Sequence, residues 1–386
     1  MEALDIWPAL LLDIRDVSLK TSDEDNIIAL LERNDRVCSI DLEYLRSSPC
    51  EKVWAAMQVP FPEMTYLSLR SRAETLPVIP DSFLGGSAPR LKTVWLDGIP
   101  FPELPKLLSS AIHLSQLRLR EIPHSGYFSP EVMVICLSTL TRLESLYLEF
   151  ESPRSHPDRE IRSLPPPKRF VLPALMYFRF RGVSEYLEDI VTCIDTPKLK
   201  NFYMTFFNQV DFDNPQLAQF ITRTPIFKAP DEARVQFHDG TVSVVLPSWT
   251  SGYGKTLIEI SSREPDQQLP SIAQICTSSL PPLSTVKNLY IEHHYSQLVW
   301  ETDAVENIQW LELFLPFTGV KNLYLSEESA LGIIRALREL VGSRTTEVLP
   351  ALQKIFVARH RLSRSIIRQF VAARELSGHP IAVSRW

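Results

Sequence analysis

Residues 114–120 read LSQLRLR, and this short stretch decides the fold. Leucines fill its first, fourth and sixth positions, so apolar and polar residues alternate toward its end. Such alternation is typical of a strand with one buried face. One strand of this kind buries about three apolar side chains, each worth roughly 1.5–3 kcal/mol, and cannot fold alone. The stretch therefore predicts a strand that needs similar neighbours.

The same L-x-x-L-x-L pattern, with aliphatic or aromatic substitutes, recurs along the chain. Eleven matches begin at residues 14, 37, 64, 91, 114, 143, 175, 199, 286, 320 and 352. The first eight lie 23 to 32 residues apart, close to the roughly 20–29 residues of a leucine-rich repeat. Helix-start signals lie between the motifs, at Ser48-Pro49, Ser129-Pro130 and Asn214-Pro215. We therefore predict an α/β leucine-rich-repeat solenoid (horseshoe) over residues 1–386, with a parallel concave sheet and a mostly helical convex side.

Three segments depart from the repeat. Residues 152–173 hold six prolines, which predicts an exposed loop, with polyproline recognition as an alternative. Residues 233–260 are predicted to form strand-rich irregular repeats, with a hairpin at Asp239-Gly240 and a strand replacing the helix on the outer side. Residues 361–386 are predicted to form a C-terminal cap, whose helix ends before Gly378.

The composition limits the function classes. Hydrophobic residues make up 45% and charged residues 22%, and the formal charge is −6, so the chain can fold but lacks the basic surface of a general nucleic-acid binder. No apolar run approaches the roughly 20 residues of a membrane span, and no signal peptide is recognisable. The five cysteines are widely spaced, which favours buried free thiols. We expect a cytoplasmic or nuclear protein with no nucleic-acid or membrane partner.

Two motifs suggest chemistry without completing it. Gly254-Lys255-Thr256 resembles the end of a phosphate-binding loop, but the required earlier glycine is Trp249, and the following residues favour a strand. His293-His294 lacks further ligands at metal-binding spacing. We therefore predict no metal, no cofactor and no catalytic residue. The alternative to a binding protein is an enzyme with a dispersed site.

The fifth motif position lies between two buried residues and must face the concave side. It is occupied by Ser18, Asp41 and Ser68 and then by the predicted partner-binding residues Trp95, Arg118, Tyr147, Arg179, Tyr203, Tyr290, Tyr324 and Phe356. Trp, Tyr and Arg are enriched at interface hot spots. The structural alternative is that aromatic residues favour strands and that the arginines stack on their rings.

The seventh motif position also faces the concave side and alternates in charge. It is occupied by Lys20, Glu43, Arg70, Asp97, Arg120, Glu149 and Arg181. Parallel strands in register place each charge opposite two of the other sign. The pattern predicts an ion-pair ladder that specifies strand order, because a skipped repeat brings like charges together.

Several segments resemble one protein family. They are residues 34–38 (NDRVC), 55–62 (AAMQVPFP), 320–326 (VKNLYLS) and 376–386 (LSGHPIAVSRW). With them the chain resembles the repeat region of F-box-like proteins from mushroom-forming fungi. The resemblance implies substrate receptors of cullin-type ubiquitin ligases, in which an F-box binds the adaptor Skp1 and the repeats bind the substrate. Because the first motif begins at Ile14, we expect no F-box before it and no Skp1 binding by this chain unless one lies upstream. A stand-alone repeat scaffold or regulator is the alternative.

Overall fold

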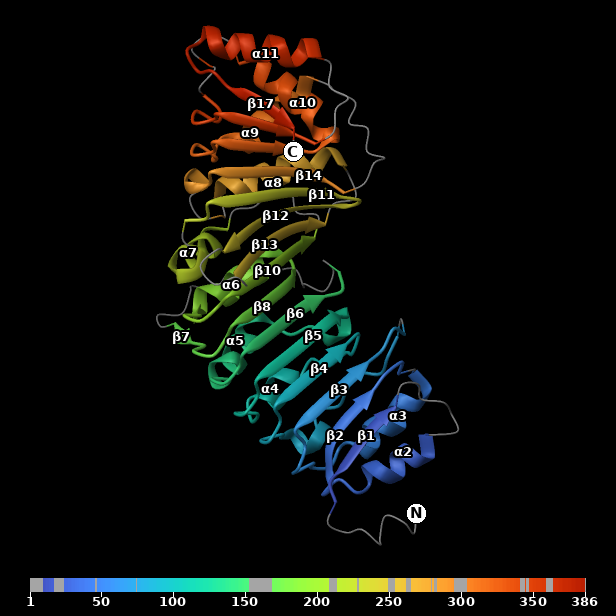
Figure 1. Ribbon diagram of the computed structural model, residues 1–386. Coiled ribbons are helices and arrows are strands. Elements are labelled where there is room, and N and C mark those ends of the chain that lie inside the picture. The colour runs from blue at the N-terminus through green and yellow to red at the C-terminus, as the bar shows by residue number, and fades with distance from the viewer. Residues whose placement is uncertain are drawn as a thin grey trace. The chain divides into compact units, whose positions relative to one another are not determined.

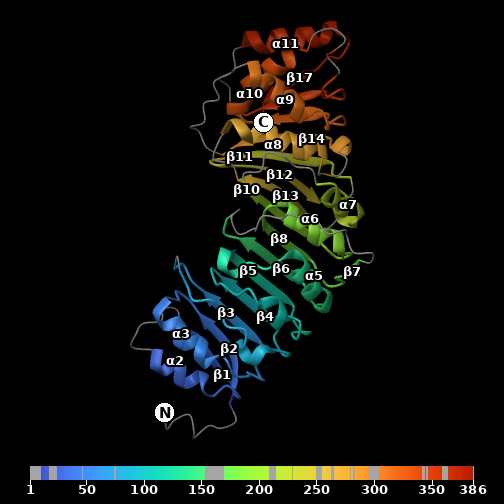
Figure 2. The same cartoon turned by 180° about the vertical axis from the view of Figure 1, so that it is seen from behind.

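The computed structural model divides the chain into two compact units, Met1–Leu199 and Lys200–Trp386. In each unit the helices lie on one face of a sheet and leave the other face open (Figures 1 and 2). The structure describes residues 10–16, 24–45, 47–73, 75–152, 169–207, 214–227, 229–248, 254–261, 265–278, 280, 283–294, 304–340, 344, 347–358 and 364–385. Each unit is an α/β repeat solenoid, as predicted.

The sheet of the first unit is parallel throughout, and its strands follow chain order. They are β1 (Leu12–Asp16), β2 (Val37–Leu42), β3 (Tyr66–Arg70), β4 (Thr93–Asp97), β5 (Gln116–Ile122), β6 (Ser145–Phe150) and β8 (Tyr177–Gly182). The connections carry α2 (Glu24–Leu31), α3 (Ser47–Ala56), α4 (Leu104–Leu108), α5 (Pro130–Thr139), α6 (Ser184–Cys193) and the 3-10 turns η1 (Phe83–Gly86) and η2 (His124–Gly126). A separate pair joins β7 (Phe170–Val171) to β9 (Ile194–Asp195).

The repeat register in this unit is the predicted one from the second motif onward. Leu67 pairs with Ile40 on one side and with Val94 on the other. All three side chains have 0% exposure. The motif residues therefore form one continuous core between the sheet and the helices.

The first motif was placed wrongly. Ile14 pairs with Ile40, so it occupies the fourth motif position and not the first. The strand ends at Asp16, and residues 17–20, including the predicted Ser18 and Lys20, lie outside the described residues. Arg15, which pairs with Asp41, takes the fifth position. Leu12 and Ile14 alternate with Asp13 as strand residues do, so β1 forms over Leu12–Asp16.

The helix starts were predicted to within two residues. Ser129 caps α5 by accepting a hydrogen bond from the Val132 amide at 3.4 Å. Asn214 and Ser326 hold the cap positions of their helices without a capping side-chain bond. Helix α3 begins at Ser47, one residue before the predicted cap. Residues 153–168 of the predicted loop lie outside the described residues.

The second unit contains strands in the order β10-β13-β12-β11-β14-β15-β16-β17. Their bounds are β10 (Asn201–Phe207), β11 (Glu232–His238), β12 (Thr241–Ser248), β13 (Gly254–Ser261), β14 (Asn288–His293), β15 (Asn322–Leu325), β16 (Lys354–Val357) and β17 (Ala382–Arg385). The helical elements are α7 (Pro215–Arg223), η4 (Pro225–Phe227), α8 (Pro265–Ser278), η5 (Leu283–Thr285), α9 (Ala304–Phe314), α10 (Glu327–Arg338) and α11 (Arg364–Leu376).

The irregular segment corrects the predicted topology. The hairpin at Asp239-Gly240 is confirmed, with Gly240 at a φ of 72°. Its strands are not on the outer side, however: β11, β12 and β13 lie within the sheet, and β12 is antiparallel to both neighbours. The two reversals at β12 leave β11 and β13 running in the same direction, and β13 is parallel to its other neighbour, β10. One face is buried throughout, as at Val235 and Val244, which is why the segment joins the core.

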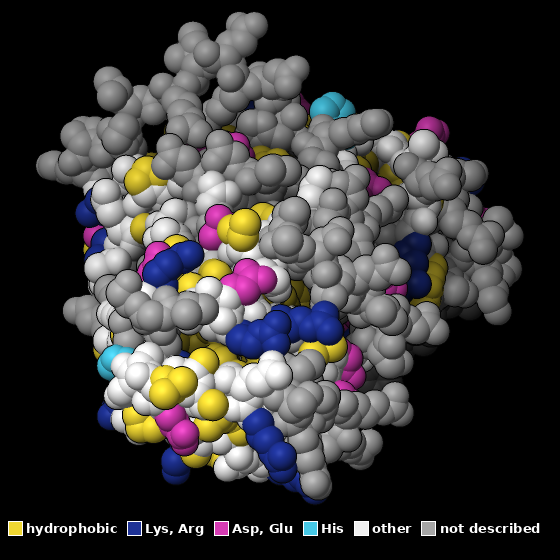
Figure 3. Space-filling model, turned by 90° about the horizontal axis from the view of Figure 1, so that it is seen from above, with side chains coloured by type: hydrophobic (Ala, Val, Ile, Leu, Met, Phe, Trp, Pro, Cys, Tyr) yellow, Lys and Arg dark blue, Asp and Glu magenta, His cyan; other side chains and the backbone are white. Residues whose placement is uncertain are grey.

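The C-terminal segment adds a strand that the sequence did not predict. Helix α11 packs against α10 and buries Phe370, and its end is closed at Gly378, with a φ of 76°. Beyond it, β17 pairs with β16 through Ile355 and Val383. Hydrophobic and charged side chains are interspersed over this end of the unit (Figure 3). Within the described ranges, none of the helices is long and apolar enough to cross a membrane.

Candidate binding surface

The open face of the first unit brings four predicted residues into one row. Register pairs join Trp95 on β4 to Arg118 on β5, then to Tyr147 on β6 and to Arg179 on β8. All four side chains are half-buried. Because parallel strands lie about 4.8 Å apart, consecutive members of the row are in reach of one another. We call these four residues the first-unit row.

Rings and guanidinium groups alternate in this row and stack. The Arg118 guanidinium lies 5.3 Å from the Trp95 ring centre and 5.0 Å from that of Tyr147. Arg70, from the seventh motif position, covers Trp95 at 4.4 Å, and the Tyr177 ring stacks on Tyr147 at 4.8 Å. The sequence did not predict that Arg70 and Tyr177 stack on the row. A signal was present, because a charged and an aromatic side chain stand at motif positions next to the row.

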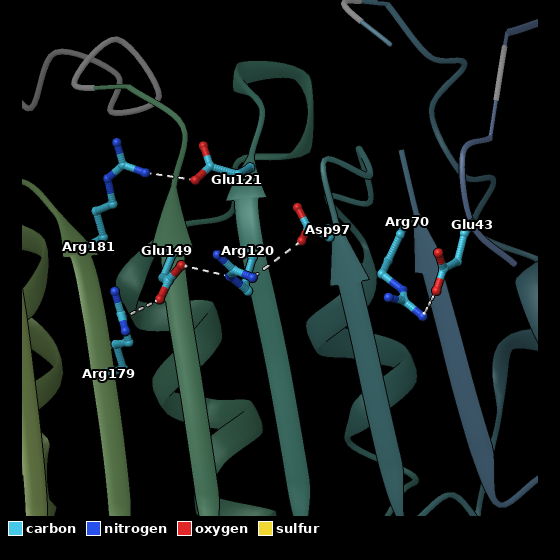
Figure 4. Close-up of polar contacts among 8 residues, drawn as sticks. All are labelled: Glu43, Arg70, Asp97, Arg120, Glu121, Glu149, Arg179 and Arg181. Carbon is cyan, nitrogen blue, oxygen red and sulfur yellow. Dashed lines mark hydrogen bonds and ion pairs between the residues drawn. The ribbon is translucent and has the colours of Figure 1, made fainter. Parts of the chain in front are cut away.

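The ion pairs of the seventh motif position lie beside the row, at the carboxyl ends of the strands (Figure 4). Arg120 contacts Asp97 at 3.7 Å and Glu149 at 3.1 Å. Arg70 pairs with Glu43, and with Asp41 at 3.0 Å. Among the described residues no ion pair joins Arg70 to Asp97, because Arg70 pairs toward β2 while stacking on Trp95. The predicted ladder therefore exists only in part: it is broken between Arg70 and Asp97, and Arg181 pairs with Glu121 and not with Glu149 among the described residues.

Glu149 is the most buried charge in this group. Its side chain is 2% exposed, and it receives a hydrogen bond from Arg120 Nε. Arg179 Nε lies 2.6 Å from its other oxygen, without hydrogen-bond geometry, and so forms an ion pair only. Burial alone lowers the pKa of Arg120, but the bond to Glu149 and the nearby Asp97 and Glu121 raise it above its ordinary value. This carboxylate therefore holds two arginines in place.

A β-bulge adds a further carboxylate at the same edge. The register between β5 and β6 shifts after Leu119, and Glu121 takes a φ of 47°, a strained value for a residue with a side chain. The bulge brings the Glu121 carboxylate to 2.7 Å from Arg181, two strands away. Burial raises the pKa of Glu121 despite Arg181, with Glu149 and Asp97 adding to the rise.

Two hollows open beside these charges. A cavity of about 570 Å³ is lined by Ser71, Arg72, Asp97, Gly98, Arg120, Glu121 and Glu151 among others. A smaller one of about 300 Å³ is lined by Glu43, Tyr44, Arg70, Ser71, Arg72, Trp95, Asp97 and Arg120. Gly98 is required here, because its φ is 67° and a Cβ would lie 2.5 Å from the Ser71 carbonyl oxygen. Both hollows are polar, and both contain charges of both signs.

The open face of the second unit carries a different row. The Tyr290 and Tyr324 rings stack at 4.3 Å and 9°, and the Tyr324 and Phe356 rings at 4.6 Å and 7°. Arg234 on β11 covers Tyr290 at 4.4 Å and is ion-paired to Glu232 and Glu292. We call Tyr290, Tyr324 and Phe356 the second-unit row. Arg234 was missed because its segment was assigned to the outer side.

Tyr203 does not join the second-unit row. It pairs with Leu257 of β13, and β13, β12 and β11 separate its strand from β14. The sequence placed Tyr203 and Tyr290 on either side of a gap in the repeat, and three strands of the sheet fill that gap. The inserted hairpin is the physical reason for the break.

The two adjacent histidines stack on different rings. His293 lies against Phe237 at 4.7 Å, and His294 against His238 at 4.6 Å. Burial lowers the pKa of His293 to about 4. Gly254–Ser261 is a strand, as predicted for the residues after the apparent phosphate-binding loop. Within the described ranges, no three His, Cys, Asp or Glu side chains are grouped to hold a metal ion.

Two comparisons with known proteins found no match to the chain. No protein-family model matches the chain. No curated protein matches it significantly.

Proposed function

We propose that the chain is a protein-interaction module that binds its partner on the open face of the first unit. The observation that carries this proposal is the first-unit row, in which Trp95, Arg118 and Tyr147 lie side by side and half-buried. Rigid aromatic anchors flanked by arginine are typical of interface hot spots. The adjoining ion pairs form a polar rim beside this centre.

The resemblance to F-box-like proteins supports a more specific role. In that role the repeats are the substrate-recognition part of a ubiquitin ligase receptor. A stand-alone scaffold uses the same surface without a ligase, and co-precipitation of the full-length natural protein with Skp1 distinguishes the two. The other candidate is an enzyme with a dispersed site, because this surface carries the carboxylates Asp97, Glu121 and Glu149. Each of these carboxylates, however, is engaged by an arginine.

The test compares capture of cellular proteins by the full chain and by variants. We expect Trp95→Ala combined with Tyr147→Ala to lose partners that the unaltered chain enriches, because both rings of the row are removed. The matched control is Val132→Ala combined with Ile135→Ala on α5, two exposed apolar residues on the helical face, with exposures of 45% and 65%. Unchanged capture by the first variant, or loss with the control alone, contradicts the proposal.

A further inference from the structure

Arg118 differs from the other arginines on the strands of the first unit in how its charge is balanced. Those others form ion pairs: Arg15 with Asp13, Arg70 with Asp41 and Glu43, Arg120 with Asp97 and Glu149, Arg179 with Glu149, and Arg181 with Glu121. In the described part of the chain, Arg118 has no carboxylate partner. Its contacts are the two rings on either side.

The arrangement of the row explains this difference. The strand neighbours of Arg118 are Trp95 and Tyr147, so its own position offers no carboxylate. The acidic residues two positions further along the neighbouring strands, Asp97 and Glu149, are already engaged by Arg120 and Arg179. A guanidinium held between rings keeps a planar fork of donors in a restricted orientation. The cation is therefore preorganised for a planar acceptor that the described residues of the unit do not supply.

Unsatisfied donors gather at the same place. The Nε–H of Arg118, the Nε1–H of Trp95 and the Nε–H of Arg70 are buried without hydrogen-bond acceptors. The Ser68 hydroxyl, on a side chain with 0% exposure, also lacks a partner. Buried polar groups are normally hydrogen-bonded, so such a cluster indicates a missing interaction. Three of the four groups can only donate, and an acceptor-rich, anionic ligand complements them.

A second cation extends the surface in one direction. Arg72 is exposed and lines the same 300 Å³ hollow as Trp95. Among the described residues no ion pair involves it. Arg118 lies on β5, to one side of Trp95, and Arg72 follows β3 on the other side. Among the described residues that line the hollow beside Trp95 or lie in its row, the two charges without an ion pair, Arg118 and Arg72, are positive. Glu151, which lines the neighbouring hollow, also has no ion pair among the described residues, and the whole chain has a formal charge of −6.

We propose that the first-unit row recognises an acidic peptide segment of the partner, with a carboxylate or phosphate group hydrogen-bonded to the Arg118 fork. This inference rests on the proposed function and specifies its partner. Arginine forks bind both carboxylates and phosphates through paired, charge-assisted hydrogen bonds. Loss of such bonds lowers affinity by about 10- to 100-fold.

The experiment selects binders to the full chain from a random dodecapeptide display library. We expect peptides enriched in Asp and Glu from the unaltered chain, and loss of that enrichment with Arg118→Gln. Arg142→Gln is the matched control, since Arg142 is an exposed arginine in the turn before β6. Thermal melting checks that both variants are folded.

The outcomes separate this inference from the proposed function. One outcome is that the enriched peptides lack acidic residues and are lost in Trp95→Ala but kept in Arg118→Gln. That outcome overturns the acidic preference but still supports the proposed binding surface. Absence of any enrichment contradicts both. Fluorescence anisotropy with a selected peptide, carrying either glutamate or phosphoserine at its acidic position, then identifies the preferred anion. Equal affinity of its glutamine version also overturns the inference.

Discussion

The two units place different chemistry at the same repeat position. In the second unit, three aromatic rings stack on one another at 4.3 and 4.6 Å. In the first, rings alternate with guanidinium groups, and one of these groups lacks a carboxylate among the described residues. Stacked rings occupy each other's faces and stabilise the sheet. Alternating rings and arginines leave hydrogen-bond donors for a ligand, and we therefore assign recognition to the first row and a structural role to the second.

The largest expected effect that distinguishes the units is the pH dependence of the stability of the second unit. The folded-state pKa of His293, about 4, lies below the ordinary value of 6.5, so folding favours the neutral ring. The resulting stability is present above pH 6.5 and is lost as pH falls toward 4, by up to about 3 kcal/mol. Hydrogen exchange between pH 7 and 4.5 should show lost protection in β11 and β14. In His293→Phe this pH-dependent loss should become smaller, with a remainder from His238, whose pKa is also lowered by burial. An undiminished loss contradicts the assignment.

The next effect concerns the buried carboxylate of the first unit. Glu149→Gln removes the charge that holds Arg120 and Arg179, and we expect about 2 kcal/mol less free energy of unfolding. Glu63→Gln is the control, because Glu63 pairs with a 59%-exposed Arg90 and should change stability by less than about 1 kcal/mol. Urea unfolding measures both. Equal effects show that Glu149 does not organise this edge.

A smaller effect tests the structural role of the second-unit row. Tyr324 stacks between two rings, so Tyr324→Leu loses both stacking contacts and about 1–2 kcal/mol. Capture of the partner should not change in this variant once it is folded. If the variant keeps full stability but loses capture, the roles assigned to the two rows must be reversed.

The predictable part of the fold is the part fixed by local periodicity. The register around Leu67 and Leu117 followed from apolar spacing alone, because a one-residue slip exposes every core side chain. The placement of β11 to β13 did not, since strands within the sheet and strands outside it share the same alternation. The stacking of Arg70 on Trp95 depends on the direction of the Arg70 side chain, and the bulge at Glu121 depends on one extra residue in β5. The motif specifies neither feature.

The central claim is that the first-unit row, and not the second-unit row, contacts the partner. The most direct measurement places a photo-crosslinking benzoylphenylalanine at position 147 or, separately, at position 324 of the full chain, and compares the yield of cross-linked partner. Both sites are half-buried tyrosines on open sheet faces, so the probe replaces a similar ring in each. The account predicts a cross-link from position 147 and only background from position 324. Equal yields, or a cross-link from position 324 alone, contradict it.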